Sequence, residues 1–164
     1  MLQAGQGAGE FFDELRPSAT IDQPVSERPG DGTRLKLVAN SWVATIVAAT
    51  AQSIALAQGL GLDPRAFLDM MKGGAVDAPY LHIKGEAIID GQFATSFAVD
   101  GAVKDTGLIA AAMRDSGTDA ALMEAVSGQY RKASDAGHGE KDMAAIFYAF
   151  RPRDPHHPHD RSEP

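Results

Sequence analysis

Hydrophobic and polar positions divide this chain into one long uncharged stretch followed by several shorter amphipathic stretches. From Leu37 to Leu62 there is no charged residue, and small and apolar side chains dominate. This pattern predicts one long helix that begins near Thr33, its expected N-cap, and ends at about Gln58. Gly59 and Gly61 follow, and glycine readily takes the left-handed conformation that ends helices. We therefore expect a long central helix that the rest of the domain buries.

Start and stop signals after this helix predict further helices. Asp63-Pro64 and the run from Asp77 to Pro79 each place an aspartate before a proline, as at many helix starts. The expected helices cover residues 65–72, 80–89, 100–114, 120–133 and 140–150, with an extended or irregular stretch at 93–99 and a loop at 135–139. The expected fold class is therefore all-α, a multi-helix domain around one long central helix.

Several side chains have predicted places in this fold. In the helix 120–133, the side chains expected to form a buried stripe are Leu122, Met123, Val126 and Tyr130. Trp42, Met70 and Met71 are expected in the core or at a dimer interface.

Both ends of the chain differ from its middle. Residues 1–29 contain three prolines and many small or polar residues, which is typical of a linker or a largely disordered remnant. Residues 151–164 contain four prolines and little that could be buried, so they are expected to form a disordered tail. The predicted helical domain therefore covers residues 30–150.

Charge and composition narrow the classes of function. The net charge is −7 and no basic cluster offsets it, so binding to nucleic acid or to an anionic membrane through bulk charge is not expected. The chain has no cysteine, which excludes disulfides and a cysteine nucleophile and fits a cytoplasmic protein. The stretch Leu37–Leu62 is long enough to span a bilayer, but polar residues interrupt it, so we expect a buried helix instead. No metal site is expected, because the histidines at 156, 157 and 159 lie in the predicted tail.

Lys36 and Asn40 are the clearest candidates for chemistry. Their spacing of four residues places an ammonium group and an amide on one face of a helix. Gly30 and Gly32, just before them, would let a ligand approach the backbone closely. Such a pair could serve a site that handles an alcohol or a carbonyl. Taken alone, the spacing also fits a solvated lysine and an asparagine that bonds to a neighbouring helix.

Several motifs in register extend this pattern. The segment from Gly30 to Asn40 fills every fixed position of Gly-x-Gly-x-x-x-Lys-x-x-x-Asn. It resembles the substrate-binding signature of the β-hydroxyacid dehydrogenases, a family that includes 3-hydroxyisobutyrate dehydrogenase and, more distantly, 6-phosphogluconate dehydrogenase. Phe97 followed by Lys104-Asp105 resembles the family's second helical signature, and the segment 137–145 resembles its closing Gly-x-x-Asp-x-x-Ala region. The resemblance runs in order through residues 30–150.

The resemblance implies an NAD- or NADP-dependent oxidoreductase that acts on a small molecule, and an all-helical domain that commonly dimerises. It implies that Lys36 is the general acid/base, that Asn40 orients the substrate oxygen and that Lys104 lies near the cofactor or a substrate anion. Gly30 and Gly32 would belong to the substrate-binding signature.

The chain shows no strand, Gly-x-Gly-x-x-Gly turn and helix of the kind that binds a dinucleotide. Two hypotheses follow. One is the C-terminal domain of an oxidoreductase whose site a separate Rossmann domain completes. The other is a catalytically inactive helical dimerisation module. In either case, dimerisation through the uncharged helix is predicted.

Overall fold

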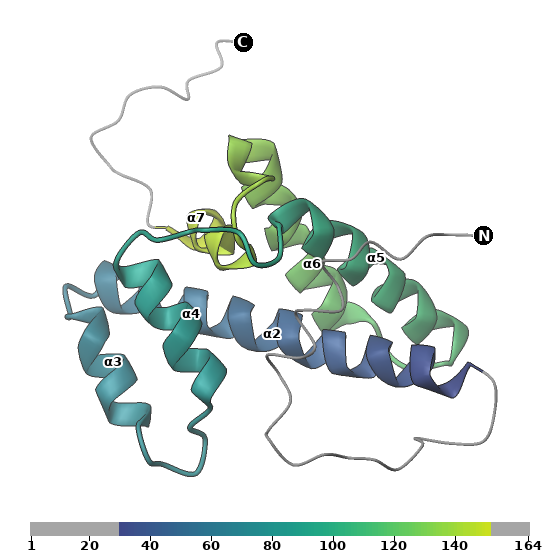
Figure 1. Ribbon diagram of the computed structural model, residues 1–164, viewed down its shortest axis with the longest axis horizontal. Coiled ribbons are helices and arrows are strands. Elements are labelled where there is room, and N and C mark those ends of the chain that lie inside the picture. The colour runs from purple at the N-terminus through teal and green to yellow at the C-terminus, as the bar shows by residue number, and fades with distance from the viewer. Residues whose placement is uncertain (1–29, 152–164) are drawn as a thin grey trace.

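The computed structural model describes residues 30–151, and within this range it contains helices and no named strand (Figure 1). The predicted all-α class is therefore confirmed. The expected linker 1–29 lies outside the described residues, as does the expected tail apart from Arg151. The elements are α2 (Asp31–Gly59), α3 (Pro64–Met71), α4 (Pro79–Ile89), α5 (Val99–Asp115), α6 (Ala121–Ala133), a π-helical turn η1 (Ser134–His138), a 3₁₀ turn η2 (Met143–Ile146) and α7 (Phe147–Phe150).

Helix α2 is the central element, as the uncharged stretch predicts. It contacts α3, α4, α5, α6, η2 and α7, and Figure 1 shows it crossing the middle of the domain, with α3 and α4 near its C-terminal end and α5 and α6 along its other half. Its buried face consists mainly of small and β-branched side chains, including Val43, Val47, Ala51 and Ile54. Small side chains let neighbouring helices approach closely, so one helix can pack against several partners.

The two ends of α2 differ in how well they were predicted. The helix begins at Asp31, two residues before the expected N-cap Thr33, so that prediction was wrong. Gly30 occupies the N-cap position in a left-handed conformation, with φ of 92°, and no side chain caps the helix. Asp31 instead places a negative charge in the first turn, where it complements the helix dipole. At the other end Gly61 has φ of 71°, as the predicted glycine stop requires.

By length and composition alone, α2 is the one helix within residues 30–151 that could span a bilayer. The core helix of a globular domain passes the same test. Here one face of α2 belongs to the core, while the side chains of Leu35, Val38, Trp42 and Leu56 on it are exposed.

The helix α3 follows its sequence signal closely, whereas α4 does not. Asp63 caps α3 by accepting a hydrogen bond from the Arg65 backbone N–H at 2.9 Å. The residue at the N-cap of α4 is Ala78, and no side chain caps this helix. The Asp77 carboxylate accepts from the Gly73 N–H at 2.7 Å and contacts His82 at 2.6 Å. Because it is engaged by these two groups, it does not cap α4.

The C-terminal third departs most from expectation. In α6, Met123, Val126 and Tyr130 are buried as predicted, but Leu122 is 66% exposed. The predicted loop 135–139 begins as the turn η1, which follows α6 directly and is broken at Gly137, where φ is 87°. The predicted helix 140–150 starts only at Met143. Backbone bonds from Val99 N–H to Lys141 C=O and from Asp142 N–H to Phe93 C=O hold residues 141–142 extended. Tertiary pairing therefore overrides local helix propensity here.

Two residues that were expected in the core or at a dimer interface are at the surface. Trp42 is 68% exposed and Met70 is 78% exposed, so neither belongs to the core. Leu35, Val38 and Trp42 are exposed and lie three and four residues apart, so they form an apolar stripe along the outer face of α2. A dimer interface at this stripe stays a prediction.

Candidate active site

Asn40 joins the two helices that carry the predicted site. Its side-chain amide, Nδ2, donates a hydrogen bond to Oδ2 of Asp105 on α5 at 3.2 Å. Its other polar atom, Oδ1, is buried and has no hydrogen-bond partner within the described residues. An acceptor of this kind is costly to bury without a donor, so it marks a place where a ligand hydroxyl could bind.

Asp105 lies between two competing influences. Burial raises the pKa of its carboxyl above the ordinary value, while the positive charges of Lys36 and Lys104 and the hydrogen bond from Asn40 act in the opposite direction. The charges of both lysines therefore reach this carboxylate. Lys36 is half-buried on α2, and the Lys104 side chain is exposed on α5. Asn40 therefore contacts this carboxylate, and the charges of Lys36 and Lys104 act on it.

Asp105 is the residue that sequence reasoning left without a role. It stands in the Lys104-Asp105 pair of the second signature, but no function was assigned to it. A carboxylate one position after a predicted ligand-binding lysine was an available signal. The finding that it bonds to Asn40, 65 residues earlier, required the packing of α5 on α2.

Gly30 and Gly32 lie at the N-terminal end of α2, before Lys36. A side chain added at either position would meet no atom within 4 Å. Gly30 has a backbone reason to be glycine, because its φ of 92° is strained for other residues. Gly32 is inside the helix and exposed, with no such reason. Open space at Gly32 is what the close approach of a ligand would need.

Phe97 borders the same part of α5. A Cβ built on Gly101 would lie 3.0 Å from Cζ of the Phe97 ring, so the ring rests directly on the glycine. Gly101 precedes Lys104 and Asp105 by three and four residues, which puts all three on neighbouring positions of one helix surface. The structure therefore brings both predicted signatures, one on α2 and one around α5, to one region.

A hollow beside α2 is a different feature. It is a groove of about 700 Å³ between the first half of α2 and the second half of α5. Its lining includes Leu37, Val38, Ile109 and Met113, and none of the candidate site residues. No group of three or more histidine or acidic side chains with metal-binding geometry occurs in residues 30–151. The three histidines of the tail lie outside that range.

Comparison with known proteins decides the family. The family model described as "NAD-binding of NADP-dependent 3-hydroxyisobutyrate dehydrogenase" matches residues 30–150. The chain belongs to this family. The match covers the whole predicted helical domain, and it supports NAD or NADP as the cofactor.

Individual relatives agree with this assignment. The chain is 28% identical over 122 residues to glyoxylate/succinic semialdehyde reductase 2 of Arabidopsis thaliana, covering 74% of this chain and 34% of the relative. It is 30% identical over 121 residues to L-threonate dehydrogenase of Cupriavidus necator, covering 74% and 41% respectively. A solved 3-hydroxyisobutyrate dehydrogenase from Salmonella typhimurium superposes with a TM-score of 0.72 at 27% identity, covering 77% of this chain and 44% of that one.

The chain therefore spans less than half the length of these relatives. They support the general kind of protein, a relative of NAD(P)-dependent β-hydroxyacid dehydrogenases.

Proposed function

We propose that this chain is the helical, C-terminal domain of an NAD(P)-dependent oxidoreductase that acts on a small β-hydroxyacid or a related aldehyde. The observation that carries the proposal is the hydrogen bond from Asn40 to Asp105, which joins the two signatures; the charges of Lys36 and Lys104 act on the same carboxylate. The family assignment and the two signatures support it.

The roles of the side chains follow from their chemistry. The cofactor would accept the hydride that leaves the carbinol carbon during oxidation. The Lys36 amine would accept the proton of the same hydroxyl group, and as an ammonium it would return that proton to the carbonyl oxygen during reduction. Asn40, already fixed by Asp105, would orient the substrate oxygen by accepting a hydrogen bond from the substrate hydroxyl at its unpartnered Oδ1.

The remaining predicted residues suit binding. The exposed Lys104 ammonium fits a phosphate of the cofactor or the carboxylate of a substrate. Gly30 and Gly32 would admit a ligand close to the start of α2. The described residues contain no strand that could form a dinucleotide fold, so we propose that a Rossmann domain completes the site.

Complementation tests this function. The purified chain would be mixed with a separately expressed Rossmann domain of a family member, NADPH or NADH, and glyoxylate or succinic semialdehyde. Oxidation of the cofactor should depend on both proteins. Lys36→Met should lower kcat by about 10²- to 10⁴-fold, the usual contribution of general acid/base catalysis. Lys72→Met, at the exposed C-cap of α3, is the control and should leave the rate unchanged.

Two results would contradict the proposal. Unchanged turnover in Lys36→Met would remove the acid/base role. No turnover and no cofactor binding, with any Rossmann partner, would favour the inactive dimerisation module instead.

Association through α2 is the second part of the proposal. Leu35, Val38 and Trp42 form an uncharged exposed stripe, and apolar hollows border α2 along its length. A second copy of the chain would cover this stripe in a homodimer. A cytoplasmic location, without binding to membranes or nucleic acid, is part of the same proposal and rests on the net charge of −7.

A further inference from the structure

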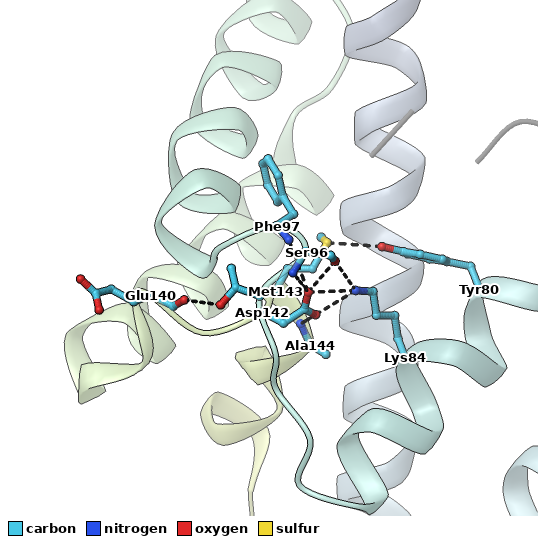
Figure 2. A network of polar contacts seen from close by, with 9 residues as sticks. Tyr80, Lys84, Ser96, Phe97, Glu140, Asp142, Met143 and Ala144 are labelled. Atoms are coloured by element: carbon cyan, nitrogen blue, oxygen red, sulfur yellow. Dashed lines mark hydrogen bonds and ion pairs between the residues drawn. The ribbon is translucent and has the colours of Figure 1, made fainter. Parts of the chain in front are cut away.

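A buried ion pair joins α4 to the residue just before η2. Lys84 on α4 and Asp142 just before η2 are 6% and 3% exposed, and the Lys84 ammonium contacts both carboxylate oxygens, at 2.9 and 3.0 Å (Figure 2). Removing two charges from water is expensive, so a buried pair by itself is a weak source of stability. The ion pair matters more for the neighbouring groups that it holds in place.

The Asp142 carboxylate organises the segment that precedes α5. Its Oδ2 accepts hydrogen bonds from Ser96 Oγ at 2.8 Å, from the Ser96 N–H at 3.2 Å and from the Phe97 N–H at 3.4 Å. The Met143 N–H donates to the Phe97 carbonyl at 2.7 Å. Both backbone polar groups of Phe97 are therefore bound by Asp142 and its neighbour.

Lys84 orients that carboxylate from the opposite side. Its ammonium also donates to Ser96 Oγ at 3.2 Å, so one cation contacts both the carboxylate and the hydroxyl that bonds to it. Figure 2 shows Lys84 reaching this centre from α4 while the Phe97 ring points away from it. The ring rests on Gly101, one turn before Lys104 and Asp105.

From this chain of contacts, we propose that the buried Lys84–Asp142 pair is a positioning device that sets the Phe97 ring against Gly101 and so shapes the α5 side of the candidate site. Phe97 is the group through which the pair acts, and neither Lys84 nor Asp142 contacts substrate. The consequence for substrate rests on the proposed function, whereas the position of the ring does not.

The Gly101 signals in an NMR spectrum of the whole chain test this directly, because an aromatic ring in contact shifts the resonances of its neighbour. Phe97→Ala defines the Gly101 shifts without a ring. In Lys84→Met these shifts should move toward the Phe97→Ala values, while Lys84→Arg, which keeps the charge and donors, should stay near the parent. The control is Thr50→Val, a buried change whose hydroxyl bonds only to the Ile46 carbonyl on the same helix. It should leave Gly101 unchanged.

Ser96→Ala covers the case in which Lys84→Met does not fold, since Ser96 is exposed and loses only its bonds to Asp142 and Lys84. It should move the Gly101 signals in the same direction by a smaller amount. If folded Lys84→Met or Ser96→Ala keeps the parent Gly101 shifts, the positioning role is wrong.

Activity of the complemented enzyme gives a second readout. Lys84→Met should lower kcat/KM on the order of 10-fold to 100-fold in the parent chain, and it should cause almost no additional loss in a chain that already carries Phe97→Ala. If no activity appears with any variant, the proposed function fails, and the Gly101 shifts alone decide the positioning role.

Discussion

The Asn40 amide donates to the Asp105 carboxylate across the interface of α2 and α5, at 3.2 Å. The bond fixes which face of the amide is used, because Nδ2 is committed to Asp105 while Oδ1 stays buried without a partner. It also ties a residue of the first signature to a residue of the second. A carboxylate thus anchors the neutral group of the predicted site, with two lysines close enough to act on its charge.

The pKa of Asp105 should report this arrangement. Because the Asn40 hydrogen bond and the charges of Lys36 and Lys104 all lower it, Asn40→Ala, Lys36→Met and Lys104→Met should each raise the pKa of Asp105 further. Carboxyl carbon shifts followed by NMR during an acid titration measure it. Ser41→Ala is the matched control, since the Ser41 hydroxyl donates to the Val38 carbonyl of its own helix and not to Asp105. If the pKa of Asp105 were the same in Asn40→Ala as in the parent, the proposed anchoring would be wrong.

Alanine substitutions at Gly30 and Gly32 should distinguish a glycine needed for backbone conformation from a glycine needed for ligand binding. Gly30→Ala should destabilise the chain by about 1–2 kcal/mol, because its φ of 92° is left-handed. Gly32→Ala should instead stabilise it, by up to about 1 kcal/mol, because alanine favours a helix interior. Urea unfolding measures both changes. If Gly32 admits substrate, the more stable Gly32→Ala variant should still show a raised KM in the complemented enzyme. An unchanged KM would take Gly32 out of the binding site.

Much of this fold is predictable from the sequence because its signals are local. The charge-free stretch predicts α2, Asp63-Pro64 predicts the cap and first turn of α3, and Gly61 predicts the end of α2. The spacing of Lys36 and Asn40 correctly places both on one helix face, and their roles stay predictions.

What was missed depends on contacts between distant residues. No local pattern shows that Asp142 must stay extended to bond to the segment before α5, and the residues after it have good helix propensity. Leu122 and Trp42 look like core residues by type, but their positions on the helices face outward. The candidate site also depends on such a contact, because Asp105 can bond to Asn40 only when α5 packs on α2.

Trp42 should report association through α2. It is the only tryptophan of the chain, so intrinsic fluorescence follows its surroundings. We expect the emission to shift to shorter wavelength as protein concentration rises, because dimerisation would take the exposed ring out of water. Trp42→Glu should leave a monomer in sedimentation, since a charge would be buried at the interface. Ile83→Glu, at a similarly exposed site on α4, is the control and should not change the association state. A parent chain that sediments as a compact monomer would contradict the dimer.

Asp142 and Asp105 should change the free energy of unfolding with pH in opposite directions. Burial tends to raise the pKa of Asp142, but hydrogen bonds from the Ala144 N–H, Lys84 and Ser96 outweigh it and hold that pKa below 3.8. As pH falls from 3.8, the unfolded chain therefore binds this proton before the folded chain does, and stability is lost. The pKa of Asp105 is raised above 3.8, chiefly by burial. As pH rises from 3.8, the unfolded chain releases that proton first, so stability falls with increasing pH until the folded carboxyl also ionises.

Two asparagine variants isolate these contributions. Asp142→Asn should weaken the acid-side loss of stability, and it should also lower stability at neutral pH by about 3–5 kcal/mol, because Lys84 is left unpaired. Asp105→Asn should remove the decline above pH 3.8 and keep the bond to Asn40 possible. Urea unfolding at a series of acidic pH values measures the slopes, and Ser96→Ala, which removes one bond that lowers the pKa of Asp142, should give a smaller change of the same sign as Asp142→Asn. If the two asparagine variants changed the slope in the same direction, the opposite environments of these carboxyls would be refuted.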